Sequence, residues 1–223
     1  MLIQGLVFDF DGLLVDTEGP AYDSWQEIYG NYGHELPLSV WGAVIGGSGR
    51  EFDPCAYLEA QVGQPLDCDA IHRQRWARKL RLTNDQPLLP GVLSYLADAK
   101  RIGLKLAVAS SSSHRWVDGH LDRLQVRAYF DAIICADDVA HVKPDPALYQ
   151  TAPQALNVHS HVAIAFEDAP NGLLAAKRAG LFTVAVPNPL TGQLSINADL
   201  RLGSLADVPL AALLAMIEEQ RRA

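Results

Sequence analysis

Side chains that can carry out chemistry collect at four places along the chain, each after a short apolar run. They are Asp9 with Asp11, the serines that begin at Ser110 and Ser111, Lys143 in a Lys-Pro-Asp-Pro stretch, and Glu167 with Asp168. Carboxylates are ligands suited to Mg²⁺, and a carboxylate beside that ion can attack a phosphorus atom and form an aspartyl-phosphate. Ammonium and hydroxyl groups can bind the oxygens of the phosphoryl group in transit. Together these residue types indicate phosphoryl transfer.

The individual residues suit different roles in such a reaction. Asp9, Asp11 and Asp168 are candidate ligands of Mg²⁺. Asp11 can also protonate the leaving oxygen and then activate water. The Ser110 hydroxyl and the Lys143 ammonium suit the phosphoryl oxygens, whose negative charge the lysine offsets.

Taken singly, each of the four groups has an ordinary explanation. Asp-Phe-Asp-Gly at residues 9–12 suits a strand end followed by a turn, and a run of serines suits a helix cap. Lys143 before Pro144 is typical of an exposed loop, and an acidic pair before Pro170 can stabilise the start of a helix. Four such coincidences in this order are improbable, so we favour the catalytic interpretation.

Five apolar runs predict the strands that would position these residues. The runs lack polar alternation, as parallel strands covered on both faces do, and they span residues 3–8, 104–109, 132–135, 162–166 and 182–186. Helical patterns lie between them, so we predict an α/β fold with a doubly wound parallel sheet. Because the carboxyl ends of such strands share one edge, where ligands bind, the four groups should meet there.

The spacing of apolar residues predicts the helices around this sheet, at residues 92–102, 116–124 and 170–179. A last helix near the C-terminus would be capped by Asp207. Pro153 falls within a helix expected over residues 146–156, so that helix should kink or start late.

Residues 17–87 interrupt this alternation of strands and helices. They contain no convincing strand, hold most of the tryptophans and tyrosines, and suit amphipathic helices at residues 22–32, 50–62 and 67–82. We therefore predict two domains. Residues 1–16 and 88–223 would form an α/β core, and residues 17–87 would form a small all-helical insert.

The composition limits the partners and the setting of the chain. Eighteen basic against 26 acidic residues give a formal net charge of −8, and no basic run is present to bind nucleic acid. No apolar run approaches the roughly 20 residues of a membrane span. Cys55, Cys68 and Cys135 form no paired motif, which argues against a disulfide framework or a zinc ribbon. We expect a cytoplasmic monomer in a reducing compartment.

The four groups also resemble the motifs of a known family. Residues 9–18, Asp-Phe-Asp-Gly-Leu-Leu-Val-Asp-Thr-Glu, resemble the first motif of the haloacid dehalogenase-like superfamily. The second, third and fourth motifs of that superfamily are resembled, in order, by Val108-Ala109-Ser110, Lys143-Pro144 and Phe166-Glu167-Asp168. The insert is similar to the small helical cap of the branch that contains β-phosphoglucomutases and phosphatases. The resemblance spans nearly the whole chain and implies a Rossmann-like core with that cap.

The resemblance also implies a role for each residue. Asp9 would be the nucleophile and Asp11 the general acid and base. The metal ligands implied are Asp9, the backbone carbonyl of Asp11, and Asp168, with Glu167 as a further candidate. The resemblance implies Ser110, Lys143 and Arg50 as substrate-binding residues, and the neighbouring Ser111 is a further candidate. Arg50 lies in Gly46-Gly47-Ser48-Gly49-Arg50-Glu51, which looks like a cap loop whose arginine meets a distal anionic group; the alternative is a plain glycine-rich connection.

Two features distinguish between activities within that superfamily. Asp11 argues against dehalogenation, because true dehalogenases lack the second aspartate. Ala21 stands about where β-phosphoglucomutases carry a cap histidine, which argues against mutase activity. We predict a Mg²⁺-dependent phosphatase that hydrolyses a small phosphorylated metabolite, a sugar phosphate, through an aspartyl-phosphate. The alternatives are a phosphosugar mutase and a non-catalytic protein that binds a phosphorylated ligand.

Overall fold

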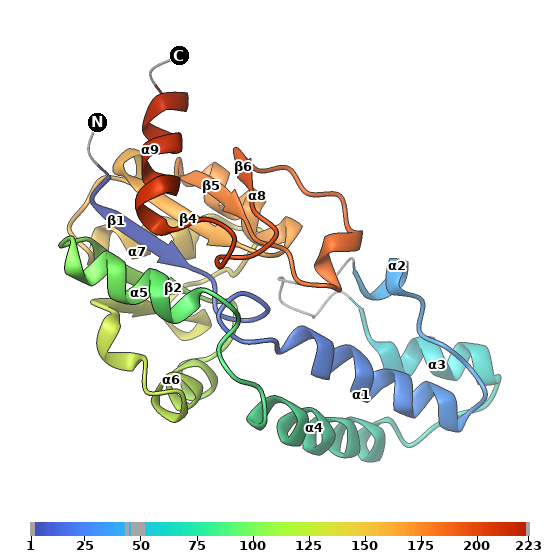
Figure 1. Cartoon of the computed structure of the whole chain (residues 1–223). Coiled ribbons are helices and arrows are strands. Elements are labelled where there is room, and N and C mark those ends of the chain that lie inside the picture. Colours follow the sequence, from blue (N-terminus) through green and yellow to red (C-terminus); the bar gives the residue numbers. More distant parts are fainter. Residues whose placement is uncertain (1–2, 43–44, 46–51, 222–223) are drawn as a thin grey trace.

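A six-stranded parallel sheet forms the centre of the structure, a computed structural model that describes residues 3–42, 45 and 52–221. The strand order is β3-β2-β1-β4-β5-β6, and all five neighbouring pairs are parallel (Figure 1). The strands are β1 (Gly5–Phe8), β2 (Lys105–Ala109), β3 (Ala132–Ile134), β4 (Ala163–Glu167), β5 (Phe182–Ala185) and β6 (Leu200–Arg201). The five predicted strands are confirmed to within two residues at each end, and the short β6 was not predicted.

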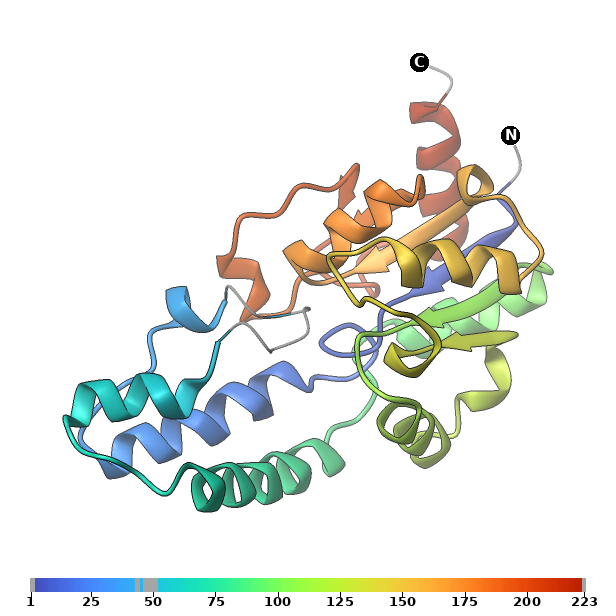
Figure 2. The same cartoon turned by 180° about the vertical axis from the view of Figure 1, so that it is seen from behind.

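Helices cover both faces of the sheet, as the continuous apolar character of the strands requires. Leu6 and Phe8 of β1 pack in one buried cluster with α5 (Val92–Arg101), α6 (His114–Arg123) and α9 (Leu210–Gln220). Val7 packs in a second buried cluster with α7 (Ala147–Ala155) and α8 (Pro170–Arg178). Figure 2 shows these two helices on the opposite face of the sheet. The doubly wound arrangement is therefore confirmed.

The ends of these helices differ in places from the sequence prediction. The helix predicted near the C-terminus begins at Leu210 after Pro209, so the prediction that Asp207 caps it was wrong. Asp207 instead accepts a hydrogen bond from the backbone N–H of Ser204. Helix α7 begins at Ala147 and contains Pro153, so it does not start late. Among the residues that the structure describes, no helix has both the length and the apolar character needed to cross a membrane.

Residues 17–87, here called the helical lobe, contain α1 (Glu18–Asn31), α2 (Leu38–Trp41), α3 (Pro54–Val62) and α4 (Cys68–Asn84). The side chains of Asp53 and Asp67 cap α3 and α4 by accepting backbone N–H groups. A separate buried cluster, which includes Trp25, Tyr29 and Leu58, holds these helices together. Figure 1 shows the lobe beyond the carboxyl ends of the strands. The domain boundaries at residues 17 and 87 stay a prediction.

The chain enters and leaves the helical lobe through two segments that lie side by side. Val15 forms an antiparallel bridge with Leu88, and the backbone N–H of Leu89 donates to the carbonyl oxygen of Leu14 at 2.9 Å. The two connections therefore form one paired joint between the sheet and the lobe.

A disulfide joins Cys55 and Cys68, so the absence of a paired cysteine motif was a wrong guide for these two residues. Cys55 lies in the first turn of α3 and Cys68 begins α4. The packing of the two helices brings the residues together, with their Cα atoms 5.8 Å apart. Their spacing of 13 residues in the sequence belongs to no recognisable motif. Cys135 is buried and free.

Candidate active site

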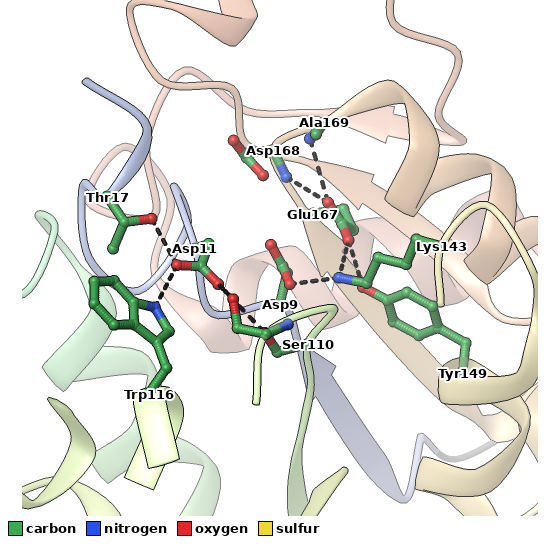
Figure 3. A network of polar contacts seen from close by, with 11 residues as sticks. Asp9, Asp11, Thr17, Ser110, Trp116, Lys143, Tyr149, Glu167, Asp168 and Ala169 are labelled. Carbon is green, nitrogen blue, oxygen red and sulfur yellow. Dashed lines mark hydrogen bonds and ion pairs between the residues drawn. The ribbon is translucent and has the colours of Figure 1, made fainter. Parts of the chain in front are cut away.

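The carboxyl edge of the sheet brings the four groups of residues together (Figure 3). Asp9 directly follows β1, Ser110 directly follows β2, and Glu167 is the last residue of β4. Lys143 reaches the same place from the loop that precedes α7. All four side chains are buried, with Ser110 and Glu167 fully inaccessible. The prediction that these positions meet at one edge is confirmed.

Lys143 lies between two carboxylates. Its Nζ donates to Asp9 Oδ1 and, at 2.7 Å, to Glu167 Oε1 (Figure 3). Burial alone would lower the pKa of the lysine, but Asp9 and Glu167 outweigh that effect and raise it above its usual value. Lys143 is therefore a fixed ammonium ion beside Asp9.

Glu167 holds this lysine in place. Its Oε1 also accepts the hydroxyl of Tyr149 at 2.8 Å, and its Oε2 accepts the backbone N–H groups of Asp168 and Ala169 at 3.1 and 3.2 Å. Each carboxylate oxygen thus has two donors, which fix the orientation of the Glu167 side chain; its predicted role as a metal ligand stays a prediction. Tyr149 was not predicted, because a tyrosine inside a buried helix gives no sequence signal.

The position of Glu167 requires a glycine in α8. A Cβ atom on Gly172 would lie 1.7 Å from Glu167 Oε1 and 2.0 Å from its Cδ. The carboxylate therefore occupies the space that any other residue at position 172 would fill.

Asp9 and Asp168 form, with Glu167, a cluster that suits a cation. One carboxylate oxygen from each of the three lies within 4.8 Å of the others. Burial raises the pKa of Asp9 and of Asp168 well above the usual value, and the neighbouring Glu167 raises both further. Asp168 Oδ1 is buried and has no hydrogen-bond partner among the residues that the structure describes. An unpartnered buried carboxylate oxygen among carboxylates is what a hard cation such as Mg²⁺ would satisfy, so the residues fit the metal.

Asn188 orients Asp168. Its Nδ2 donates to Asp168 Oδ2 at 2.9 Å and to the carbonyl oxygen of Gly12 at 3.2 Å. Gly12 has a φ of +81° and lies so close to Asp168 that a side chain would collide with it. Asn188 was not predicted, although a polar residue soon after a predicted strand was an available signal.

Within the described part of the chain, four side chains donate to the carboxylate of Asp11, two to each oxygen. Oδ1 accepts the Thr17 hydroxyl at 2.7 Å and the Trp116 indole N–H at 2.8 Å (Figure 3). Oδ2 accepts the hydroxyls of Ser112 at 2.6 Å and Ser110 at 3.3 Å. This carboxylate is not part of the cluster formed by Asp9, Glu167 and Asp168. Thr17, Ser112 and Trp116 were not predicted.

The predicted roles of two further residues, Ser111 and Arg50, stay predictions. Ser111 lies in the loop between β2 and α6, next to Ser110. Arg50 and the glycine-rich stretch around it lie outside the described residues, so its predicted contact with substrate stays a prediction.

Glu18, the first residue of α1, adds another carboxyl group near the site. Burial raises its pKa to about 7, although Lys79 lowers it and Asp11 and Asp16 raise it further. The side chain can therefore change charge near neutral pH.

Comparisons with known proteins agree with this geometry. Residues 6–186 match the family model described as haloacid dehalogenase-like hydrolase. The chain is 45% identical to YhcW of Bacillus subtilis, over 98% of this chain and all of that protein. It is 32% identical to the fructose-1-phosphate phosphatase YqaB of Escherichia coli, over 82% of this chain and 95% of that protein. The crystal structure of CbbY from Rhodobacter sphaeroides in complex with phosphate is similar with a TM-score of 0.71 and 31% identity, covering 95% of this chain and 99% of that one. A family match over most of the chain, with that family's four motifs meeting at one sheet edge, shows that this protein belongs to the haloacid dehalogenase-like hydrolases.

Proposed function

We propose that this enzyme, a phosphoric monoester hydrolase of that family, is a Mg²⁺-dependent phosphatase acting on a small phosphorylated sugar. The observation that carries the proposal is the buried Lys143, which bridges Asp9 and Glu167 beside the unpartnered Oδ1 of Asp168. This arrangement provides a nucleophile, a fixed positive charge and ligands for a metal within one enclosed site. The similarity to a fructose-1-phosphate phosphatase supports a sugar phosphate as the substrate class.

In this proposal the reaction has two displacement steps at phosphorus. A carboxylate oxygen of Asp9 attacks the phosphorus atom, and the bond from phosphorus to the sugar oxygen breaks. Asp11 gives its proton to the departing sugar oxygen. Asp11 then takes a proton from water, which attacks the aspartyl-phosphate, releases inorganic phosphate and restores Asp9.

Lys143 and Ser110 would bind the oxygens of the phosphoryl group during both steps. The lysine ammonium offsets the negative charge that these oxygens carry, and its low-dielectric surroundings strengthen the effect. Glu167 and Tyr149 keep the ammonium group directed at Asp9. Ser111, in the same loop as Ser110, stays a candidate for the same role.

Asp9, Asp168 and the backbone carbonyl of Asp11 would hold the Mg²⁺, which supplies further positive charge against the phosphoryl oxygens when bound. Asp168 has the unpartnered oxygen, and Asn188 fixes the orientation of its carboxylate.

We also propose that the helical lobe is a cap that closes over the substrate. The paired joint at Val15 and Leu88 supports this, because a single joint lets the lobe move as a unit. A closed lobe would exclude bulk water from the site while the phosphoryl group is transferred.

The test of the proposed function is phosphate release by wild-type enzyme and by Asp9→Asn. The asparagine would keep the shape of the side chain but would lack the carboxylate nucleophile, so release from fructose 1-phosphate should fall to background, and wild-type activity should require Mg²⁺. Asp122→Asn, at an exposed position on α6, is the matched control and should retain activity. Near wild-type turnover by Asp9→Asn would contradict the covalent mechanism.

A mutase is the second activity to exclude. Ala21 is buried in α1, and its side chain has no hydrogen-bonding group that could control the position of the general acid and base. We therefore expect water, and not a second sugar hydroxyl, to accept the phosphoryl group. With β-glucose 1-phosphate and a trace of glucose 1,6-bisphosphate, free phosphate should form faster than glucose 6-phosphate. The reverse order of rates would establish the mutase.

A further inference from the structure

Trp116 connects the proposed acid and base to the helical lobe. It lies on α6 of the core, and its indole N–H donates to Asp11 Oδ1 at 2.8 Å (Figure 3). Its ring faces α4 of the lobe, where the ring centroid of Trp76 lies 5.6 Å away and the Nζ of Lys79 lies 4.8 Å from the centroid of Trp116. One side chain therefore contacts both the catalytic carboxylate and the lobe.

The two oxygens of Asp11 are held from different sides. The donors to Oδ2, Ser110 and Ser112, both belong to the loop after β2 in the core. The donors to Oδ1 are Trp116, which packs against the lobe, and Thr17, which is the first residue of the lobe and directly precedes α1. The orientation of the carboxylate thus depends on one donor that contacts the lobe and one that belongs to it.

Other contacts fix the Trp116 ring without filling the space around it. The ring of His120 packs against it with a centroid distance of 4.4 Å, and burial lowers the pKa of that histidine. A cleft of about 410 Å³, lined by residues of α4 and α6, lies beside the two indoles. Trp76 is 45% exposed there. The contact between the Trp116 and Trp76 rings is therefore nonpolar packing beside a cleft, which can adjust, whereas the hydrogen bond from Trp116 to Asp11 has a fixed direction.

We propose that Trp116 is a positioning residue that sets the orientation of the Asp11 carboxylate, and that Trp76 supports it from the lobe. The inference rests on the proposed function, because it requires Asp11 to donate a proton to the leaving oxygen. Removing the indole N–H would leave Thr17 as the one remaining donor to Oδ1 among the described residues, so the carboxylate would spend less time in the productive orientation.

Substrates that differ in their need for a proton provide the test. Fructose 1-phosphate has a poor alkoxide leaving group and needs protonation, whereas 2,4-dinitrophenyl phosphate departs as a stable phenolate. For Trp116→Phe we expect kcat/KM to fall about 10- to 100-fold with fructose 1-phosphate, as the loss of one hydrogen bond to a charged group implies. With the dinitrophenyl ester kcat/KM should fall less than about threefold, because general-acid catalysis contributes little there.

Two further variants separate positioning from packing. Trp76→Ala should produce a smaller loss with the same preference for the sugar phosphate, and the double variant should resemble Trp116→Phe alone. Trp41→Phe, the matched substitution at a lobe tryptophan that does not contact Asp11, should leave the ratio between the two substrates unchanged. If Trp116→Phe does not fold, replacement of residue 116 by β-(3-benzothienyl)alanine keeps the ring shape and removes only the N–H.

The outcomes distinguish this inference from the function on which it rests. A wild-type enzyme that hydrolyses neither ester would refute the proposed function. An active wild-type enzyme with equal losses on both esters in Trp116→Phe would leave that function intact and show that Trp116 only supports the fold. Wild-type kinetics in the benzothienyl variant would also overturn the inference.

Discussion

Adding one methyl group at Gly172 should disturb the arrangement that holds Lys143. The new Cβ atom would lie 1.7 Å from Glu167 Oε1, so the carboxylate would have to move by about 1.5 to 2 Å to reach van der Waals distance. Such a movement is costly because Glu167 is fully buried and each of its oxygens has two donors. Hydrogen bonds to charged groups contribute about 1.5–3 kcal/mol each, so losing two costs about 3–6 kcal/mol.

Alanine favours the helical backbone of α8 by up to about 1 kcal/mol relative to glycine, which offsets part of that loss. We therefore expect Gly172→Ala to lower the free energy of unfolding by about 2–5 kcal/mol and to reduce phosphate release, because Lys143 would lose its fixed position. Urea titration followed by tryptophan fluorescence would measure the change in stability.

Gly30→Ala is the matched control, because Gly30 lies in α1 and a Cβ atom there would meet no atom within 4 Å. It should leave activity unchanged and change stability by less than about 1 kcal/mol, in the stabilising direction. A Gly172→Ala enzyme that is as stable and as active as Gly30→Ala would show that the four contacts of Glu167 are dispensable.

Four other predictions follow from the site and the helical lobe. Asp168→Asn should raise the Mg²⁺ concentration for half-maximal activity at least about tenfold, measurable also as weaker binding by calorimetry. Burial raises the pKa of Glu18 from 4.5 to about 7, so the folded state loses stability relative to the unfolded state as the pH rises through that interval. Glu18→Gln removes this loss, so between pH 4.5 and pH 7 its free energy of unfolding, measured by urea titration, should come to exceed that of wild type by about 1–3 kcal/mol. Replacing Cys55 and Cys68 by serine should lower stability by about 2–4 kcal/mol without abolishing phosphate release, and an unchanged urea midpoint would contradict this. Arg50→Ala should raise KM for fructose 1-phosphate more than for an aryl phosphate, and equal effects would make Arg50 structural.

The sheet could be predicted because parallel strands covered on both faces are continuous apolar runs. The run before Asp9 and the run before Glu167 differ from their surroundings in just this way. Strand β6 could not be found by the same signal, since it is two residues long and ends in an exposed arginine. The four-residue helix α2 is likewise too short to show a period.

The sequence predicted the site residues at the strand ends, but it did not predict most of the residues that hydrogen-bond to them and fix their orientation. Asp9, Ser110 and Asp168 could be placed because topology alone brings strand ends together. Tyr149 and Trp116 reach the site from helices, and which face of a helix meets a neighbour depends on packing across the whole molecule. The disulfide depends on tertiary packing in the same way, because it requires α3 and α4 to meet.

The place of β1 in the sheet has a consequence for the order in which the protein folds. Strand β1 precedes both of its neighbours in the chain, which begin at Lys105 and Ala163, so it cannot be paired on both sides until the chain has been made through β4. Its apolar Gly-Leu-Val-Phe segment stays unpaired while the helices of the lobe, which share a buried cluster of their own, are synthesised. Pairings this distant in the chain form slowly. The strand that precedes Asp9, the proposed nucleophile, is thus synthesised before both of its partners, so activity should emerge only after β4 has joined the sheet.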